Sequence, residues 1–336
     1  MLKFGIFIFW TKMTNIINYL GKCHRRLYKT RYYAKHAYLN FLPYEMIAKS
    51  LDDIICEYNR LPKETRHQIQ KRVDYYNKLN AKQSISQNLA FVGKFKNNHA
   101  SAYYYDIAQW LRYFPKNSPF AYLFGDITAI PTEPTLLKSR PIAENNQNSV
   151  IMKLDSVRHF YTRTDNLNFA QKKPLLVWRG AAHQPHRLAF LEKFANHPQC
   201  DVKCVHKKSI GKDYHGDFMS IYEQLKYKFV LSIEGNEVAT NTKWIMASQS
   251  LCFMNSPKFE TWLMEGLLEP EVHFVHLLDD YSDLEEKISF YSKNPDAAQK
   301  IINNANQWMS QFFDEKQEII TSVLVLKKYF ENTAQA

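Results

Sequence analysis

Glycine and cysteine are scarce in this sequence. The 336 residues include only nine Gly and five Cys. So few glycines, with no short repeating unit, exclude collagen-like, β-helical and linker-type chains. A small, odd number of cysteines excludes a disulfide framework and predicts reduced thiols in a cytosolic setting. Apolar residues still make up 45% of the chain and aromatic residues 15%, which is enough for a sizeable core in about two domains.

Acidic residues are missing from the first 44 positions. Eight of the 44 Lys and Arg residues lie before Glu45 and none of the 33 acidic residues does, so the remaining 292 residues carry 36 basic and 33 acidic groups. The net charge of +11 is therefore concentrated at the start of the chain. The sequence predicts a nearly neutral globular body behind a basic, aromatic leader.

A long hydrophobic run is also missing. Residues 4–10 (FGIFIFW) form an apolar run of seven, whereas a membrane-spanning helix takes about 20. No small-residue cleavage site follows this run, so we expect an uncleaved, cytosolic chain. Met13 is an alternative start, which would remove residues 1–12.

Basic and aromatic residues are interleaved between Lys22 and Lys35 (KCHRRLYKTRYYAK). This pattern fits an anionic membrane surface, at about 1 kcal/mol for each cation near it, or equally an ordinary solvated helix face. Nucleic acid is a third interpretation, through phosphate contacts and base stacking. Because the sequence has no RNP-type, zinc-finger or helix-turn-helix pattern, we expect no nucleic-acid partner.

Helical and extended patterns alternate along the rest of the chain. Residues 44–80 have helical spacing, and Pro62 opens the second of two helices there. Strands are predicted at Leu89–Val92, Phe120–Phe124, Leu175–Trp178, Val202–Val205, Tyr227–Ile233, Leu251–Met254 and Val272–Val275. Helices are predicted at His186–Asn196, Asp217–Leu225, Thr240–Ser248, Lys258–Leu267 and Asp283–Ser292, with two more between Pro295 and Phe330. This alternation is typical of βαβ units and a parallel, doubly wound α/β sheet.

The polar stretch at residues 131–148, which contains three prolines, is typical of a crossing between domains. We therefore predict a basic helical leader (1–80), an N-terminal α/β lobe (81–172), a C-terminal α/β lobe (173–312) and a C-terminal helix (313–336). A cleft between the lobes would hold ligands at the carboxyl ends of the strands.

The turn after the strand at 175–178 (WRGAAHQPHR, 178–187) has the composition of an anion site. Gly180 and the helix start that follows it can present backbone N–H groups to an anion. Arg179 and Arg187 flank the turn and could contact phosphate oxygens in bidentate fashion. The alternative, which spacing alone favours, is a tight turn with two surface arginines.

A second turn of this kind lies in KFVLSIEGNEVATNTKWIMASQSL (228–251). Thr240 or Asn241 can cap a helix there, and Lys243 falls in the first turn of that helix. A cation at a helix N-terminus is poorly placed for the helix dipole unless an anion lies beside it. The two turns together predict a phosphate-binding edge of one sheet.

Two further groups have ligand or acid–base chemistry. Asp126 follows an apolar strand and could be a general base facing the cleft, although a single Asp in a turn is the commoner case. The cluster His197, Cys200, Cys204 and His206 has zinc-ligand types, but a strand at 202–205 would turn Cys204 into the core, so we expect no metal site. The absence of Walker, GxSxG and GxGxxG motifs disfavours P-loop NTPases, α/β-hydrolases and simple dehydrogenases.

Several motifs taken in order resemble glycosyltransferase family 90. They are WRG…HR (178–187), LSIEGNEVATNTKWIMASQSLCFM (231–254), KFETWLMEGLLEPEVHFV (258–275) and DDYSDLEEKI (279–288). The family includes protein O-glucosyltransferases of animals and bacterial lipopolysaccharide transferases of the LpsA type, and the bacterial branch is the more similar. The resemblance covers roughly residues 120–290. It implies a GT-B fold, in which two Rossmann-like lobes enclose a cleft and the C-terminal lobe holds the nucleotide sugar.

The resemblance also implies the roles of individual residues. Donor binding falls on Arg179, Gly180 and Arg187, on the segment Val238, Ala239, Thr240, Asn241, Thr242 and Lys243, and on Glu260 as an acceptor for ribose or sugar hydroxyls. Asp126 aligns with the proposed base of the family. Members typically work without a metal, and the absence of an Asp-x-Asp triplet agrees with this expectation.

We therefore expect an inverting, metal-independent enzyme without a cofactor. It would move glucose or galactose from a UDP-hexose to a lipopolysaccharide or lipooligosaccharide core acceptor. The basic leader, through residues 22–35, would keep it cytoplasmic and peripheral at the inner face of the inner membrane. The alternative is a non-catalytic nucleotide- or carbohydrate-binding protein with the same cleft.

Overall fold

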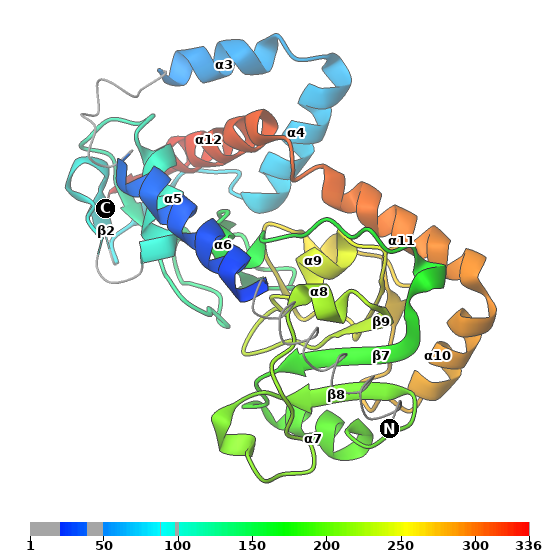
Figure 1. Cartoon of the computed structure of the whole chain (residues 1–336). Coiled ribbons are helices and arrows are strands. Elements are labelled where there is room, and N and C mark those ends of the chain that lie inside the picture. Colours follow the sequence, from blue (N-terminus) through cyan, green and yellow to red (C-terminus); the bar gives the residue numbers. More distant parts are fainter. Residues whose placement is uncertain (1–20, 39–49, 88, 98–100, 336) are drawn as a thin grey trace.

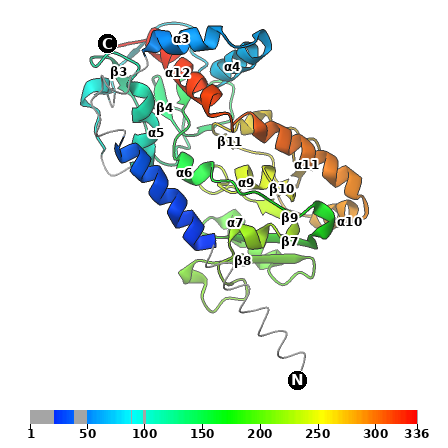
Figure 2. The ribbon, with the colours of Figure 1, turned by 45° about the horizontal axis from the view of Figure 1, so that its top comes forward.

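The structure, a computed structural model, describes residues 21–38, 50–87, 89–97 and 101–335 (Figure 1). The apolar run at residues 4–10 and the alternative start Met13 lie outside these ranges. A parallel sheet in the second half of the chain and a more helical first half form one continuous molecule (Figures 1 and 2).

Five parallel strands form the central sheet. Their bounds are Lys173–Gly180 (β7), Cys200–Cys204 (β8), Tyr227–Ser232 (β9), Leu251–Met254 (β10) and Val275–His276 (β12). The spatial order is β12-β10-β9-β7-β8, and each neighbouring pair is parallel. Taken along the chain this is the order 2-1-3-4-5 of doubly wound α/β sheets, in which the winding reverses between β7 and β9. Ligands of such sheets bind at that reversal, beside the carboxyl ends of the two strands.

Successive side chains of each strand point to opposite faces of the sheet, so the sheet divides the interior into two cores. Leu176 and Trp178 of β7 face one core, and Val177 between them faces the other. In β9, Phe229 and Leu231 share the first core with Leu176. Because both faces are apolar, the strands are buried on both sides, as in other parallel sheets covered by helices.

Helices cover both faces of this sheet. The bounds are Pro185–Phe194 (α7), Ile221–Gln224 (α8), Thr242–Met246 (α9), Leu284–Lys293 (α10) and Pro295–Ser310 (α11), with 3₁₀ turns at Phe169–Gln171, Lys207–Ser209 and Glu265–Leu267. Apolar side chains of α7 and α10 fill the core beside Trp178, and those of α9 fill the core beside Val177. Helix α11 contributes to both cores.

The first half of the chain has short strands that pair two by two. Its helices are Leu51–Asn59 (α3), Lys63–Tyr76 (α4), Ser101–Leu111 (α5) and Ser156–His159 (α6), with a 3₁₀ turn at Val92–Lys94. Its strands are Gln83–Ile85 (β1), Leu89–Phe91 (β2), Pro119–Ala121 (β3), Thr135–Leu137 (β4), Arg140–Pro141 (β5) and Ser149–Ile151 (β6). β2 pairs with β3 and β4 with β6, and a bridge between Tyr122 and Leu136 links the two pairs. A Rossmann-like first lobe, and with it the GT-B arrangement and the four-part division, therefore stays a prediction.

The end of the chain returns to the first half. Helix α12 (Glu315–Glu331) packs against α4, and strand β13 (Thr333–Gln335) pairs in parallel with β1. Glu318 of α12 is buried and accepts hydrogen bonds from Arg72 at 2.5 Å and Lys153 at 2.6 Å. Although burial alone would raise its pKa, these two cations hold the pKa of Glu318 below its usual range.

The basic segment forms a helix over residues 21–38 that spans the two halves (Figures 1 and 2). Near its end, the Tyr32 hydroxyl donates to Asp106 of α5 at 2.6 Å, and Asp106 also accepts from the backbone N–H of Ser156 at 2.7 Å. Near its start, Lys22 lies 4.7 Å from the centre of the Phe218 ring in the second half. The helix is thus packed against both halves.

The predicted α/β class with a parallel sheet is confirmed, and the predicted helix at Lys258–Leu267 is wrong. Phe259–Glu260 is a short strand (β11) that pairs antiparallel with β5. Met264 then takes a positive φ of 60°, which a helix does not allow. Buried pairing with β5 therefore overrides the helical spacing of the apolar residues.

Candidate active site

The turn after β7 lies at the reversal point of the sheet and is braced by Arg187. Its guanidinium donates to the carbonyl oxygens of Ala181 at 3.0 Å, Ile233 at 2.7 Å and Glu234 at 2.8 Å. These bonds join the turn after β7 to the turn after β9. Burial lowers the pKa of Arg187 to about 10, which still leaves it charged at neutral pH.

Gly180 is required by packing rather than by an unusual backbone angle. A Cβ atom at this position would lie 2.4 Å from the ring of Trp178, which folds back over the glycine. Arg179 beside it is paired with Asp201, at 2.5 Å. The predicted Arg-Gly-Arg turn is therefore held largely by contacts within the protein.

A cavity of about 330 Å³ opens at the carboxyl ends of β9 and β10. Val238, Ala239 and Thr242 of the predicted donor-binding segment line it. His186, at the start of α7, and Gly235, after β9, line it as well. The cavity therefore lies at the carboxyl edge of the sheet, next to the reversal between β7 and β9.

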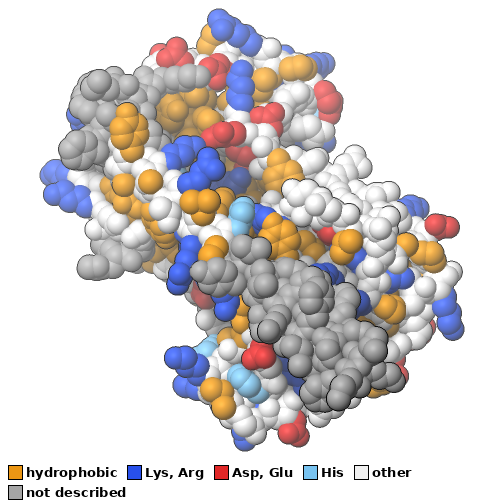
Figure 3. All heavy atoms as spheres, in the orientation of Figure 1, with side chains coloured by type: hydrophobic (Ala, Val, Ile, Leu, Met, Phe, Trp, Pro, Cys, Tyr) orange, Lys and Arg blue, Asp and Glu red, His pale blue; other side chains and the backbone are white. Residues whose placement is uncertain are grey.

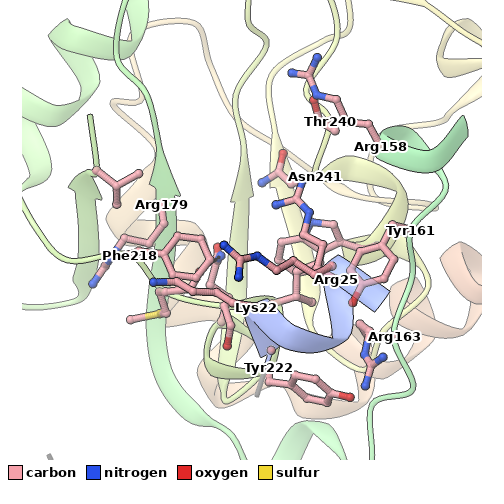
Figure 4. A pocket seen from close by; sticks show the side chains of 18 of the residues that line it. Lys22, Arg25, Arg158, Tyr161, Arg163, Arg179, Phe218, Tyr222, Thr240 and Asn241 are labelled. Carbon is pink, nitrogen blue, oxygen red and sulfur yellow. Dashed lines mark hydrogen bonds between the residues drawn. The ribbon is translucent and has the colours of Figure 1, made fainter. Parts of the chain in front are cut away.

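Thr240, Asn241 and Arg179 line a second and larger cavity of about 670 Å³ (Figure 4). The loop between β9 and α9 therefore separates the two cavities. The predicted donor-binding residues thus fall on both sides of this loop.

Lys243 and Glu260 line neither cavity within the described part of the chain. Lys243 is completely buried, and its ammonium donates to Glu265 at 2.6 Å. Glu260 is 1% exposed and accepts hydrogen bonds from Arg140 at 2.6 Å and from the Tyr75 hydroxyl. Donor contacts by these two residues stay predictions, and both groups already have charged partners inside the protein.

Asp126 lies where the two halves meet. Its Oδ1 accepts from Lys138 at 3.0 Å, and its Oδ2 accepts from the Asn236 side chain, in the turn after β9, at 3.1 Å. The Asp126 side chain is 38% exposed. Partial burial alone would raise its pKa, but the hydrogen bond and charge of Lys138, with the bond from Asn236, hold the pKa below its usual value.

Glu237 is a second carboxyl group in this network, and sequence reasoning did not assign it a role. Lys138 also pairs with its Oε1, so one ammonium joins Asp126 and Glu237. Glu237 is 3% exposed, and its Oε2 is buried without a hydrogen-bond partner among the described residues. Burial raises the pKa of Glu237 to about 7 despite the charge of Lys138. Sequence reasoning also missed Lys138. The feature that could have marked it is the position of a cation directly after the strand-like run Thr135–Leu137.

The residues considered for zinc are dispersed. Cys204 faces the core, as predicted, while His197 contacts Glu285 at 2.9 Å. Within the described ranges, no three His, Cys, Asp or Glu side chains come together in a way that could hold a metal ion.

Comparison with known proteins assigns the chain to a class. The family described as Glycosyl transferase family 90 matches residues 147–331, more than half of the chain. The chain belongs to this family and is a glycosyltransferase.

Individual relatives add detail. The chain is 52% identical to the O-glucosyltransferase LpsA of Dichelobacter nodosus, over 92% of this chain and 97% of that protein. It is 28% identical to human protein O-glucosyltransferase 3 over 37% of this chain and 24% of that protein. It is 31% identical to protein O-glucosyltransferase 2 of Danio rerio over 25% of this chain and 16% of that protein. The animal enzymes therefore share only a segment with it.

None of the helices in the described ranges has both the length and the apolar composition needed to cross a membrane.

Proposed function

We propose that the chain transfers glucose from UDP-glucose to a hydroxyl group of a lipopolysaccharide or lipooligosaccharide core, by direct displacement with inversion. The observation that carries this proposal is the 52% identity to the O-glucosyltransferase LpsA, which extends over nearly the full length of both chains. Of the two hexoses that the family resemblance allows, glucose and galactose, the name of this relative favours glucose.

The nucleotide sugar would bind at the carboxyl ends of β9 and β10. Two turns line the cavity there, one at Gly235 and one at Val238–Ala239. They suit a diphosphate because backbone N–H groups can donate to its oxygens and small side chains allow it to approach closely. In a GT-B arrangement the second half would hold the donor, and the acceptor would approach from the side of Asp126.

Asp126 would take the proton of the acceptor hydroxyl. The hydroxyl oxygen attacks the anomeric carbon, the bond from that carbon to the UDP oxygen breaks, and UDP leaves with the electron pair. Lys138 and Asn236 each occupy one site on the carboxylate, and a carboxylate has about four acceptor sites, so room remains for the hydroxyl. The low pKa of Asp126 keeps it ionised at neutral pH.

The charge on the departing diphosphate would be stabilised without a metal. Backbone N–H groups of the turn after β9 and the positive field of Arg179 and Arg187 would supply this term. Lys243 stays a predicted diphosphate contact, and it could reach one only if its ammonium left Glu265.

Peripheral attachment to an anionic inner-membrane surface through residues 22–35 is also part of this proposal. All six cations in this segment are exposed on the helix: Lys22, Arg25, Arg26, Lys29, Arg31 and Lys35.

The test of the proposal is transfer from labelled UDP-glucose to lipooligosaccharide by wild type and by Asp126→Asn. A general base contributes about 10²–10⁴-fold, so the variant should lose at least 10²-fold in turnover and keep its affinity for UDP. Asp52→Asn, which removes an exposed carboxylate on α3, is the control and should behave as wild type. Unchanged turnover in Asp126→Asn would remove it as the base, and failure of every UDP-hexose to bind would overturn the proposed donor.

A further inference from the structure

The larger cavity, of about 670 Å³, is lined by cations and by no acidic side chain among the described residues. Its seven basic residues are Lys22, Arg25, Arg26, Lys29, Arg158, Arg163 and Arg179. Figure 4 shows Lys22 and Arg25 in the middle of the view, with Arg179 on one side and Arg163 on the other. Figure 3 shows Lys and Arg side chains along the helix of residues 21–38 where it crosses between the two halves. A hollow with one sign of charge concentrates ligands of the opposite sign.

Most of this charge is not neutralised within the described part of the chain. Arg179 is paired with Asp201, and Arg158 lies 3.7 Å from Asp155, but Arg25 and Arg26 form no ion pair there. Arg163 contacts the His24 ring through Nη1 at 2.6 Å, and its Nε atom is buried without a hydrogen-bond partner among the described residues. Arg25 and Arg26, which are exposed, are therefore available to an anion inside the cavity.

Aromatic rings complete the wall of the cavity. Phe218, Tyr161, Tyr222 and Trp244 line it, and the guanidinium of Arg163 lies 4.2 Å from the centre of the Tyr222 ring. Flat rings next to cations suit a ligand that has both an apolar face and a negative charge, which a sugar phosphate or a sugar acid has.

The cavity adjoins the proposed donor site. Thr240 and Asn241 line it, while Val238 and Ala239, earlier in the same loop, line the smaller cavity. A ligand in the larger cavity would therefore lie next to a donor bound across that loop.

We infer that the larger cavity binds an anionic sugar of the acceptor, one that carries a phosphate or a carboxylate. This rests on the proposed function, since it names the part of the acceptor that the enzyme recognises. It also gives Lys22, Arg25, Arg26 and Lys29 a ligand within the protein's own cleft.

The experiment measures the binding of glucose 6-phosphate, glucuronate and glucose to the full chain by calorimetry, first alone and then with UDP at saturation. Glucose 6-phosphate or glucuronate should bind at least tenfold more tightly than glucose, with or without UDP. Glucose binding with equal affinity would overturn the inference. Displacement by UDP would also overturn it, because the cavity would then be the phosphate subsite of the donor.

Two matched variants locate the site. Lys22→Gln/Arg25→Gln removes two charges that line the cavity, and Arg31→Gln/Lys35→Gln removes two from the same helix that do not line it. The first should weaken binding of the anionic sugar at least tenfold, and the second should change it less than twofold. Equal effects on the sugar would overturn the inference.

A role of the helix in membrane binding alone predicts a different result. If the helix served only an anionic surface, both variants would sediment less with phosphatidylglycerol vesicles, and to the same extent. Neither variant would then change sugar binding, and this result would overturn the inference. Thermal unfolding of each variant confirms that it is folded. Because these measurements use no sugar transfer, loss of the proposed transferase activity alone would leave them intact.

Discussion

Replacing Lys243 distinguishes a buried structural cation from a diphosphate contact. The Lys243 ammonium lies 2.6 Å from Glu265, and the two side chains are 0% and 3% exposed. Lys243→Met keeps the apolar stem but leaves the Glu265 carboxylate in the interior without its cation. Breaking a buried pair from one side costs about 3–5 kcal/mol, because the remaining charge has no compensation.

The loss should be visible in urea unfolding followed by circular dichroism. With a slope of about 3 kcal/mol per M, the midpoint should fall by about 1–1.7 M. Lys243→Met/Glu265→Gln removes the stranded charge as well, and Gln can still accept the hydrogen bond from the backbone N–H of Thr261. This double variant should recover most of the midpoint.

UDP binding decides between the two roles. A structural cation predicts that the double variant binds UDP within a few fold of wild type. If Lys243→Met unfolds like wild type and yet loses UDP affinity by tenfold or more, the buried-pair reasoning is wrong and Lys243 contacts the donor.

Three other predictions follow from the described contacts. Arg187→Lys should lower the free energy of unfolding, measured in urea, by about 1.5–3 kcal/mol for each hydrogen bond to a carbonyl that the ammonium cannot make. The same variant should bind UDP more weakly in a thermal-shift assay. Burial raises the pKa of Asp106 from 3.8 to about 7, so the folded chain takes up a proton there that the unfolded chain does not hold between these pH values. The stability that this proton contributes is lost as pH rises through that window. Between pH 5 and 8 wild type should therefore lose roughly 2–3 kcal/mol more stability than Asp106→Asn, and parallel curves would contradict this. EDTA should leave glucose transfer unchanged, and an activity restored only by a divalent cation would contradict the metal-independent mechanism.

The strands of the second half could be predicted because their signal is local. Runs such as Leu251–Met254 are apolar, short and bounded by polar turns, and the structure places a strand there with the same bounds. The parallel, doubly wound arrangement also follows from alternating strands and helices, but the order of the strands does not, because more than one order satisfies this alternation. Where a segment pairs with a distant one, as Phe259–Glu260 does with Arg140–Pro141, the local spacing predicted the wrong element.

The candidate site could be predicted only as a set of turns. Sequence spacing brought forward Arg187 and Asp126, but their partners are remote in sequence. Lys138 is 12 residues from Asp126, and Asn236 is 110 residues away. That Lys243 points into the protein, rather than toward the cleft, depends on Glu265, a residue of the segment 258–275 to which the sequence analysis gave no role.

The return of α12 and β13 to the first half has a consequence for synthesis of the chain on the ribosome. Strands β7 to β12 are contiguous in sequence and can assemble as soon as they emerge. The first half is made earlier, but α4 lacks its packing partner and β1 its paired strand until the last residues have been added. The first segment to be translated is therefore the last to complete its core, and nascent chains that stop before residue 315 should expose that apolar surface to chaperones.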